Sequence, residues 1–288
     1  MPMPPSAAAA PGAAPAAASA AAPAPVAQAA PPPRVRGRFE ADADTFQLVA
    51  SSHGLTLHKP MYVLPLTYSP AYQGHDSEML FQISLKQQIL GMPLYFAYTQ
   101  KSFWQAYNSR RSAPFRETDY NPELFYRFIP ADRDRWFHLG VDAGFEHESN
   151  GQGLPGSRSW NRIYIAPFQE QEGDHLVYWK FWWRFPENDQ LPATDPHRDD
   201  NPHIGAWYGY SELHYEQRLF DDKQVAHFTF RYNPATGNGA AGLQYTIPNS
   251  ATDPQFYWML YFWQGYGESL GDYNRSVTRV GLGVALTR

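Results

Sequence analysis

The chain has 288 residues, a formal net charge of −5, aromatic residues at 16% and no cysteine. This composition excludes disulfides and thiolate metal sites, and it gives no basic field for binding nucleic acid. No apolar run of about 18 residues is present for a membrane-spanning helix, so the composition leaves a soluble aromatic-rich β protein or a membrane β-barrel, whose strands need only alternate.

Residues 1–50 differ from the rest of the chain. Residues 1–35 consist mainly of Ala and Pro, and such a segment buries too little apolar surface to offset the entropy lost on ordering. It also lacks the basic and Leu-rich regions of a secretory signal. We predict a disordered Ala/Pro-rich N-terminal segment over residues 1–50, either a linker or a signal remnant, followed by one domain over residues 51–288.

From about residue 55 the chain reads as β-strands with a period of two. Bulky apolar side chains occupy the odd positions of residues 177–185, whereas Tyr178, Lys180, Trp182 and Arg184 form the other face. The last segment alternates apolar and small residues over 280–287. We count about twelve segments of roughly ten residues, which is the signature of an up-and-down barrel.

The connections between these segments form two sets. The odd-to-even connections are mostly longer than the even-to-odd connections. The first set is 69–76, 105–121, 149–160, 186–203, 233–239 and 264–274, and the second is 88–92, 130–134, 169–174, 219–224 and 248–254. Outer-membrane barrels have long external loops, short periplasmic turns and an even strand count. The pattern favours an all-β, twelve-stranded antiparallel transmembrane β-barrel, although alternation by itself also fits a soluble sheet with one apolar face.

Three polar residues interrupt an otherwise apolar face next to the 149–160 connection. His147 and Ser149 end the apolar face of one segment, and Asn161 begins that of the next. If the connection closes a hairpin, the three side chains emerge together on one side of the sheet. A serine needs a base to become a nucleophile, histidine is the usual base, and asparagine can orient the imidazole. The alternative is that these residues are ordinary strand ends.

The surrounding motif resembles the outer membrane phospholipase A family. Residues 144–162 read GFEHESNGQGLPGSRSWNR and are similar to the family's His-x-Ser-Asn-Gly…Ser-Arg-Ser-Trp-Asn-Arg signature. Four further segments agree in order: YTQKSFWQ at 98–105, SAPFRETDYNPELF at 112–125, DDNP at 199–202 and GYGESLGDYN at 265–274. The resemblance covers most of residues 55–288.

The resemblance implies a calcium-dependent phospholipase A1/A2, which hydrolyses the acyl esters of glycerophospholipids and lysophospholipids. By position, Ser149 would be the nucleophile, His147 the general base and then acid, and Asn161 the residue that orients the histidine. The family's active state is a homodimer in the bacterial outer membrane. In a barrel the three residues would lie at the rim of the lipid-facing surface, and we expect the active site to face the outer leaflet.

The family's calcium positions map onto Ser112, Gln152, Ser157 and Asp200. Calcium prefers hard oxygen ligands, which Ser112, Ser157 and Asp200 offer. Position 152 is usually Arg in the family and is Gln here. If residue 152 binds calcium through its backbone carbonyl, the change from Arg to Gln should be tolerated. If the arginine charge matters, calcium affinity or substrate preference should differ.

Gln100 is an isolated amide on the apolar face of residues 96–104. A lipid-facing amide is costly unless it is paired, so we expect a hydrogen bond across a dimer interface. The alternative is that the two faces of the strand are exchanged, so that Gln100 points into the lumen and Lys101 points outward. We expect the opposite faces of the strands to fill the lumen with a hydrogen-bonded plug that includes Glu146, Glu148, Arg162, Lys180, Arg184 and Arg231.

Two other functions are compatible with parts of the pattern. One is a non-catalytic outer-membrane barrel, such as a small porin or a structural protein. The other is a soluble β-sandwich that binds carbohydrate through its many Trp and Tyr residues. The last residues, Leu286-Thr287-Arg288, lack the terminal aromatic residue usual for outer-membrane barrels, so we expect either a trimmed end or a weaker insertion signal.

Overall fold

The computed structural model describes residues 1, 55–130, 137–171, 174–192, 194–195, 197–220, 223–250, 252 and 254–287. The prediction of a disordered segment over residues 1–50 therefore falls, apart from Met1, outside the described residues. All of the elements below belong to one compact unit, Val35–Arg288. No helix in the described ranges is long and apolar enough to cross a bilayer.

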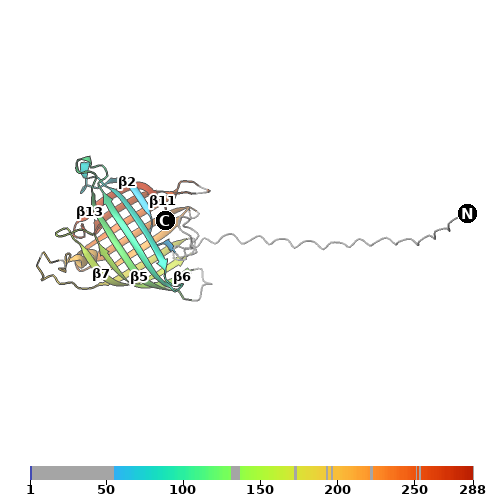
Figure 1. Ribbon diagram of the computed structural model, residues 1–288, viewed down its shortest axis with the longest axis horizontal. Helices are drawn as coiled ribbons and strands as arrows, with labels where there is room; N and C mark the ends of the chain where they lie inside the picture. The colour runs from blue at the N-terminus through green and yellow to red at the C-terminus, as the bar shows by residue number, and fades with distance from the viewer. Residues whose placement is uncertain are drawn as a thin grey trace. The chain divides into compact units, whose positions relative to one another are not determined.

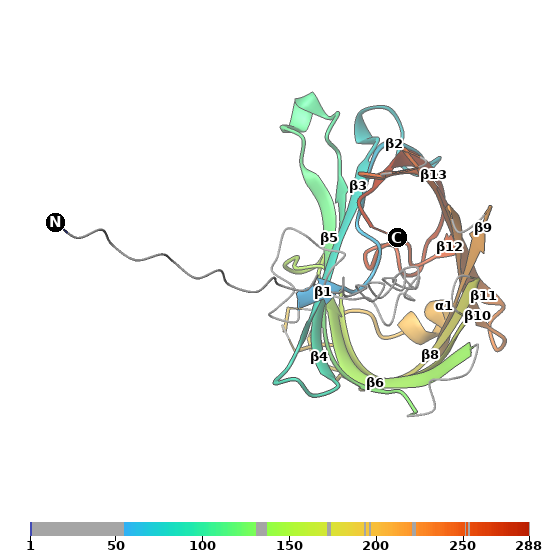
Figure 2. The same cartoon turned by 90° about the vertical axis from the view of Figure 1, so that its right-hand side faces the viewer.

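A single antiparallel sheet closes on itself through the pairing of β3 with β4 (Figures 1 and 2). β1 and β2 lie in series along β3, because Leu57 pairs with Leu85 and Tyr62 pairs with Gln82. The described strands therefore occupy twelve positions, as predicted. They are β1 (Leu55–Leu57), β2 (Tyr62–Tyr68), β3 (Met79–Gln88), β4 (Leu94–Trp104), β5 (Phe115–Phe128), β6 (Phe137–Ser149), β7 (Ser159–Gln171), β8 (His175–Arg184), β9 (Ser211–Leu219), β10 (Gln224–Asn233), β11 (Asn238–Pro248), β12 (Tyr257–Tyr266) and β13 (Ser276–Ala285).

The apolar face of the strands points outward and the polar face points into the barrel. On β6, Leu139 and Phe145 are 49% and 43% exposed, whereas Asp142 and Glu146 are fully buried. This arrangement reverses that of a soluble β-sandwich, whose apolar residues form its core. It suits a hydrocarbon environment, where a closed barrel pairs its backbone groups and presents apolar side chains to lipid. The soluble-sandwich alternative is therefore wrong.

The longer connections gather at one end of the barrel, as the sequence predicts. The connection from β8 to β9 spans residues 185–210 and includes the helix α1 (Ile204–Tyr208). Two short 3-10 helices, η3 (Gly74–Asp76) and η4 (Ser109–Arg111), lie in the β2–β3 and β4–β5 connections. The predicted connection 105–121 is too long, because Phe115 already pairs with Trp104 and the strand β5 begins there.

The lumen contains paired charges in addition to buried aromatic and aliphatic side chains. Glu146 contacts Lys180 at 2.7 Å and Arg162 at 2.6 Å, and Arg127 contacts Asp142 at 2.6 Å. Charges removed from water need such partners, because an unpaired buried charge is strongly destabilising. The predicted plug is confirmed, since the remaining predicted members are also paired: Glu148 with Arg162, Arg184 with Asp199 and Arg231 with Glu212.

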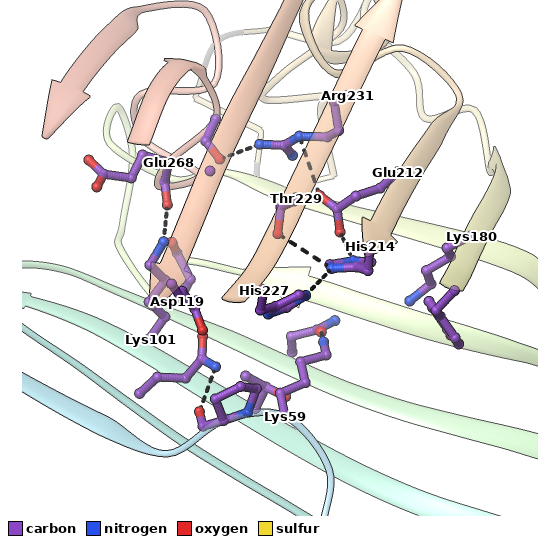
Figure 3. A pocket seen from close by; sticks show the side chains of 18 of the residues that line it. Lys59, Lys101, Asp119, Lys180, Glu212, His214, His227, Thr229, Arg231 and Glu268 are labelled. Atoms are coloured by element: carbon purple, nitrogen blue, oxygen red, sulfur yellow. Dashed lines mark hydrogen bonds and ion pairs between the residues drawn. The ribbon is translucent and has the colours of Figure 1, made fainter. Parts of the chain in front are cut away.

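A cavity of about 250 Å³ remains between these luminal side chains. Figure 3 shows part of its wall, where His214 lies between His227 and Glu212 and a separate cluster contains Lys101 and Glu268. α1 packs into the same interior, where Ile204 and Tyr208 are buried in a cluster with Trp160 and Trp182 (Figure 2). The described part of the lumen thus combines charge pairs, a buried aromatic cluster and this cavity.

Candidate active site

The β6–β7 hairpin carries the three residues singled out in the sequence. Its register pairs His147 with Asn161 and Ser149 with Ser159. His147, Ser149 and Asn161 therefore lie on the outward face that Phe145 and Ile163 continue. The strict alternation of the two strands produces this placement, because a shift of one residue would move all three side chains into the lumen.

Two of the three side chains are in direct contact. His147 Nδ1 lies 3.0 Å from Asn161 Oδ1. If Nδ1 carries the proton and donates to this oxygen, Nε2 keeps its lone pair and can act as a base. Ser149 is two residues from His147 on the same face, and its side chain makes no hydrogen bond to His147 within the described residues. Catalytic hydrogen bonds of this kind commonly tighten when substrate binds.

Asn150 shapes the loop between the two strands. Its Oδ1 accepts from the backbone N–H groups of Gln152 and Arg158, at 3.3 and 3.0 Å, and its Nδ2 donates to the carbonyl of Gly156 at 2.9 Å. The side chain is buried, so these bonds replace the water it has lost. Sequence reasoning missed this residue, although an Asn before Gly is a common signal for a turn.

Gly151 follows at a position that only glycine suits. Its φ is +64°, and a Cβ there would lie 2.7 Å from the ring of Tyr120. A side chain would therefore meet both backbone strain and a steric clash. Asn150 and Gly151 together fix where the 150–158 loop leaves β6, and so where Ser149 is presented.

Asp200 joins the β8–β9 connection to this hairpin. Its Oδ2 accepts a hydrogen bond from Ser157 Oγ at 2.6 Å, and its Oδ1 accepts from the backbone N–H of Ser159 at 2.9 Å. Two of the four predicted calcium residues are thus brought together. Their hydroxyl and carboxylate oxygens are the hard donors that calcium prefers, so this pair fits the ion.

The other two predicted calcium residues are placed differently. Gln152 lies in the same loop as Ser157, and its Nε2 donates to the carbonyl of Arg116 at 2.9 Å. Ser112 follows η4 in a left-handed conformation with φ 57°, and no hydrogen bond joins it to the other three in the described structure. No group of three or more His, Cys, Asp or Glu suited to a metal occurs among the described residues.

Comparison with known proteins identifies the family. The phospholipase A1 family model matches residues 40–286. The chain belongs to the phospholipase A1 family. A putative phospholipase A1 of Neisseria meningitidis serogroup B is 38% identical over 260 residues, or 80% of this chain and 65% of the relative, so the match spans just under two thirds of that protein. Phospholipase A1 of Escherichia coli K12 is 39% identical over 227 residues, which cover 76% of this chain and 73% of the relative.

Solved structures of outer membrane phospholipases share the fold. Outer membrane phospholipase A from Escherichia coli has a TM-score of 0.69 at 34% identity, with 81% of this chain and 98% of that chain covered. The calcium-bound dimer of the Salmonella typhi enzyme has a TM-score of 0.68 at 34% identity, with 81% and 92% covered. An active-site mutant of the Escherichia coli protein, in which an asparagine is replaced by alanine, has a TM-score of 0.68 at 34% identity, with 81% and 91% covered. Family and fold together indicate an outer-membrane protein.

Gln100 faces outward on this phospholipase A1-family barrel. Lys101, its neighbour, donates from Nζ to the carbonyl of Glu268 at 2.8 Å and lines the luminal cavity. The alternative with Lys101 outside is therefore wrong. Within the chain, the Gln100 amide accepts from Tyr98 and donates to Ser102, both at 3.2 Å.

Glu187 is a neighbour of Asn161 that sequence reasoning missed. Asn161 Nδ2 donates to Glu187 Oε1 at 3.2 Å. The two residues are 26 positions apart, and Glu187 lies in the irregular β8–β9 connection. Periodicity gives no signal in such a segment, so only the folded arrangement brings this carboxylate to the site.

Proposed function

We propose that this barrel hydrolyses the acyl ester bonds of glycerophospholipids and lysophospholipids, as a calcium-dependent phospholipase A1/A2. The contact of 3.0 Å between His147 Nδ1 and Asn161 Oδ1, next to Ser149, carries the proposal. These residues border an outward apolar surface, where the acyl chains of a membrane lipid would lie. Membership of the phospholipase A1 family supports the same reaction.

The reaction would proceed through an acyl-serine. Ser149 Oγ attacks the acyl carbonyl carbon while His147 Nε2 takes the hydroxyl proton. The tetrahedral intermediate then collapses, and His147 returns the proton to the departing glycerol oxygen of the lysophospholipid. A water molecule, deprotonated by His147, attacks the acyl-serine and releases the fatty acid. Throughout, Asn161 Oδ1 accepts a hydrogen bond from Nδ1–H and holds the imidazole in the required tautomer.

Ser157 and Asp200 would hold the calcium ion, with oxygen atoms of Gln152 and Ser112 as further ligands. When bound, the ion would supply positive charge that stabilises the oxyanion of the tetrahedral intermediate. Gln152 would serve through its backbone carbonyl, an oxygen donor that does not depend on the side chain at this position. The calcium-bound relative from Salmonella typhi supports the choice of metal.

The active state would be a homodimer with Gln100 at the interface. The relative from Salmonella typhi forms a dimer, and the outward amide of Gln100 interrupts a surface that includes the exposed Phe96 and Ile83. The longer loops of outer-membrane barrels are external. We therefore place the triad, which lies at the end with these loops, toward the outer leaflet.

The alternative of a non-catalytic porin has less support. A porin needs a water-filled channel, whereas the described lumen holds charge pairs such as Glu146–Lys180 and Arg279–Glu268 around a cavity of about 250 Å³. A structural barrel would gain nothing from the outward His147–Asn161 pair. The hydrolase is thus the function that the geometry supports best.

The test is fatty-acid release from phosphatidylcholine in mixed micelles. The purified full chain is assayed with calcium and with a chelator, beside Ser149→Ala. We expect activity only with calcium and its loss in the variant. Full activity of Ser149→Ala, or activity insensitive to the chelator, would contradict the proposed mechanism.

A further inference from the structure

Both ends of the Asn161 amide are occupied. Oδ1 faces His147 Nδ1 at 3.0 Å, and Nδ2 donates to Glu187 Oε1 at 3.2 Å. An amide that rotated by half a turn would present its N–H₂ group to His147 and could no longer accept a hydrogen bond from the imidazole N–H. A carboxylate only accepts hydrogen bonds. Glu187 therefore favours the one amide orientation that serves a histidine base.

Glu187 is itself held in place. Its side chain is 23% exposed, and Oε2 lies 4.0 Å from Nη2 of Arg184. The same guanidinium nitrogen contacts Asp199 Oδ1 at 2.6 Å, and Asp199 directly precedes Asp200. One chain of contacts thus runs from Asp199, the sequence neighbour of a predicted calcium residue, to the histidine.

The groups around Glu187 shift the pKa of its carboxyl in opposite directions. Burial raises the pKa of its carboxyl, Arg184 lowers it, and the nearby Asp199 and Asp200 raise it further. The hydrogen bond from Asn161 favours the ionised form. These groups face Glu187 from the end of β8, the 185–210 connection and the start of β7.

We propose that Glu187 is a positioning residue of the hydrolase, which fixes the Asn161 amide and supplies the negative charge that a Ser-His-Asn triad lacks. This inference rests on the proposed function. In a Ser-His-Asp triad the carboxylate contacts the imidazole directly and stabilises the imidazolium that forms. Here the carboxylate would act through one intervening amide, from a half-buried loop where ionisation costs less than it would against hydrocarbon.

Two substitutions separate orientation from charge. Glu187→Gln keeps an oxygen that can accept from Asn161 but removes the charge, whereas Glu187→Ala removes both. Asp189→Asn is the matched control, because Asp189 is exposed in the same connection and bonds only to its neighbour Gln190 in the described structure. It removes the same charge without touching Asn161.

Initial rates are measured with the full chain in calcium-containing mixed micelles, against substrate concentration and over about pH 5 to 9. We expect Glu187→Ala to lower kcat about tenfold with KM unchanged, since a transition-state interaction is lost. Glu187→Gln should lose less activity. The acidic limb of the pH–rate profile of this variant should move to lower pH, because the variant lacks a neighbouring negative charge that favours protonated imidazole. Asp189→Asn should match the wild type.

Three outcomes would overturn the inference. In the first, Glu187→Ala retains wild-type kcat and pH profile while Ser149→Ala is inactive, which leaves the proposed function intact. In the second, both Glu187 variants lose activity with no shift of the acidic limb, which indicates a merely structural contact. In the third, the wild type itself is inactive with calcium, which refutes the proposed function and, with it, the inference that rests on it. Circular dichroism of each variant verifies that the barrel has folded.

Discussion

Ser157 donates from Oγ to Oδ2 of Asp200 at 2.6 Å, and this bond connects two loops whose residues are 43 positions apart. Asp200 also accepts from the backbone N–H of Ser159, which pairs with Ser149 across the hairpin. The carboxylate thus supports the loop that follows Ser149, the proposed nucleophile. It also provides the strongest oxygen donor of the proposed calcium site.

Replacement of Asp200 should therefore weaken calcium activation strongly. We expect Asp200→Asn to raise the calcium concentration for half-maximal activity by about tenfold or more, because a charged ligand is lost. Activity is titrated with buffered calcium in the micelle assay. Gln152→Ala is the matched variant in the same site, and it should change calcium activation by less than about fivefold, because it loses one neutral hydrogen bond. Equal effects of the two variants would contradict the backbone role of Gln152.

Asn161 should matter for turnover more than for substrate binding. Asn161→Ala removes the acceptor for His147 Nδ1, and we expect kcat to fall about 10²-fold or more with little change in KM. The variant should still react with a serine-directed sulfonyl fluoride, only more slowly, whereas Ser149→Ala should not be labelled. Labelling of a residue other than Ser149, read by mass spectrometry, would refute the assigned nucleophile.

Gln100 should contribute to dimer formation. Interhelical polar contacts in membranes contribute about 0.6 kcal/mol on average, and a comparable value between barrels predicts a roughly threefold weaker dimer for Gln100→Ala. The dimer fraction is measured by chemical crosslinking in micelles with calcium. Gln264→Ala is the control, since Gln264 is another outward amide, exposed on β12. A loss of dimer in both variants alike would argue against a specific interface.

Glu187 should make the stability of the barrel depend on pH. Its folded-state pKa is raised above the ordinary 4.5, mainly by burial. The group therefore stabilises the folded state below its unfolded pKa, and this contribution is lost as pH rises through the folded pKa. Glu187→Gln should flatten the pH dependence of thermal unfolding above about pH 4.5, and it should unfold at a higher temperature than the wild type at neutral pH. Circular dichroism melting curves in detergent test this, with Asp189→Asn expected to behave as the wild type.

Alternation alone predicted much of the barrel. A period of two predicts the outward face of β6 and the inward position of Lys180 and Arg162, because one face of each strand contacts lipid and the other faces the lumen. The number of alternating segments gives the strand count. The exact strand ends did not follow. Phe115–Asn121 looked like loop because its polar residues obscure the pattern, yet the segment pairs with β4, and Glu117, Asp119 and Asn121 are buried on its inward face.

The sequence by itself determined that His147, Ser149 and Asn161 share one face of a hairpin, since the side-chain period and the Gly-rich loop are local properties. Only the tertiary structure brought Asp200 to Ser157 and Glu187 to Asn161. Both carboxylates lie in the long β8–β9 connection, which has no periodicity, and its path depends on contacts distant in sequence, such as Arg184 with Asp199. Local pattern places residues on strands, whereas loop positions are decided by long-range hydrogen bonds and buried charge pairs.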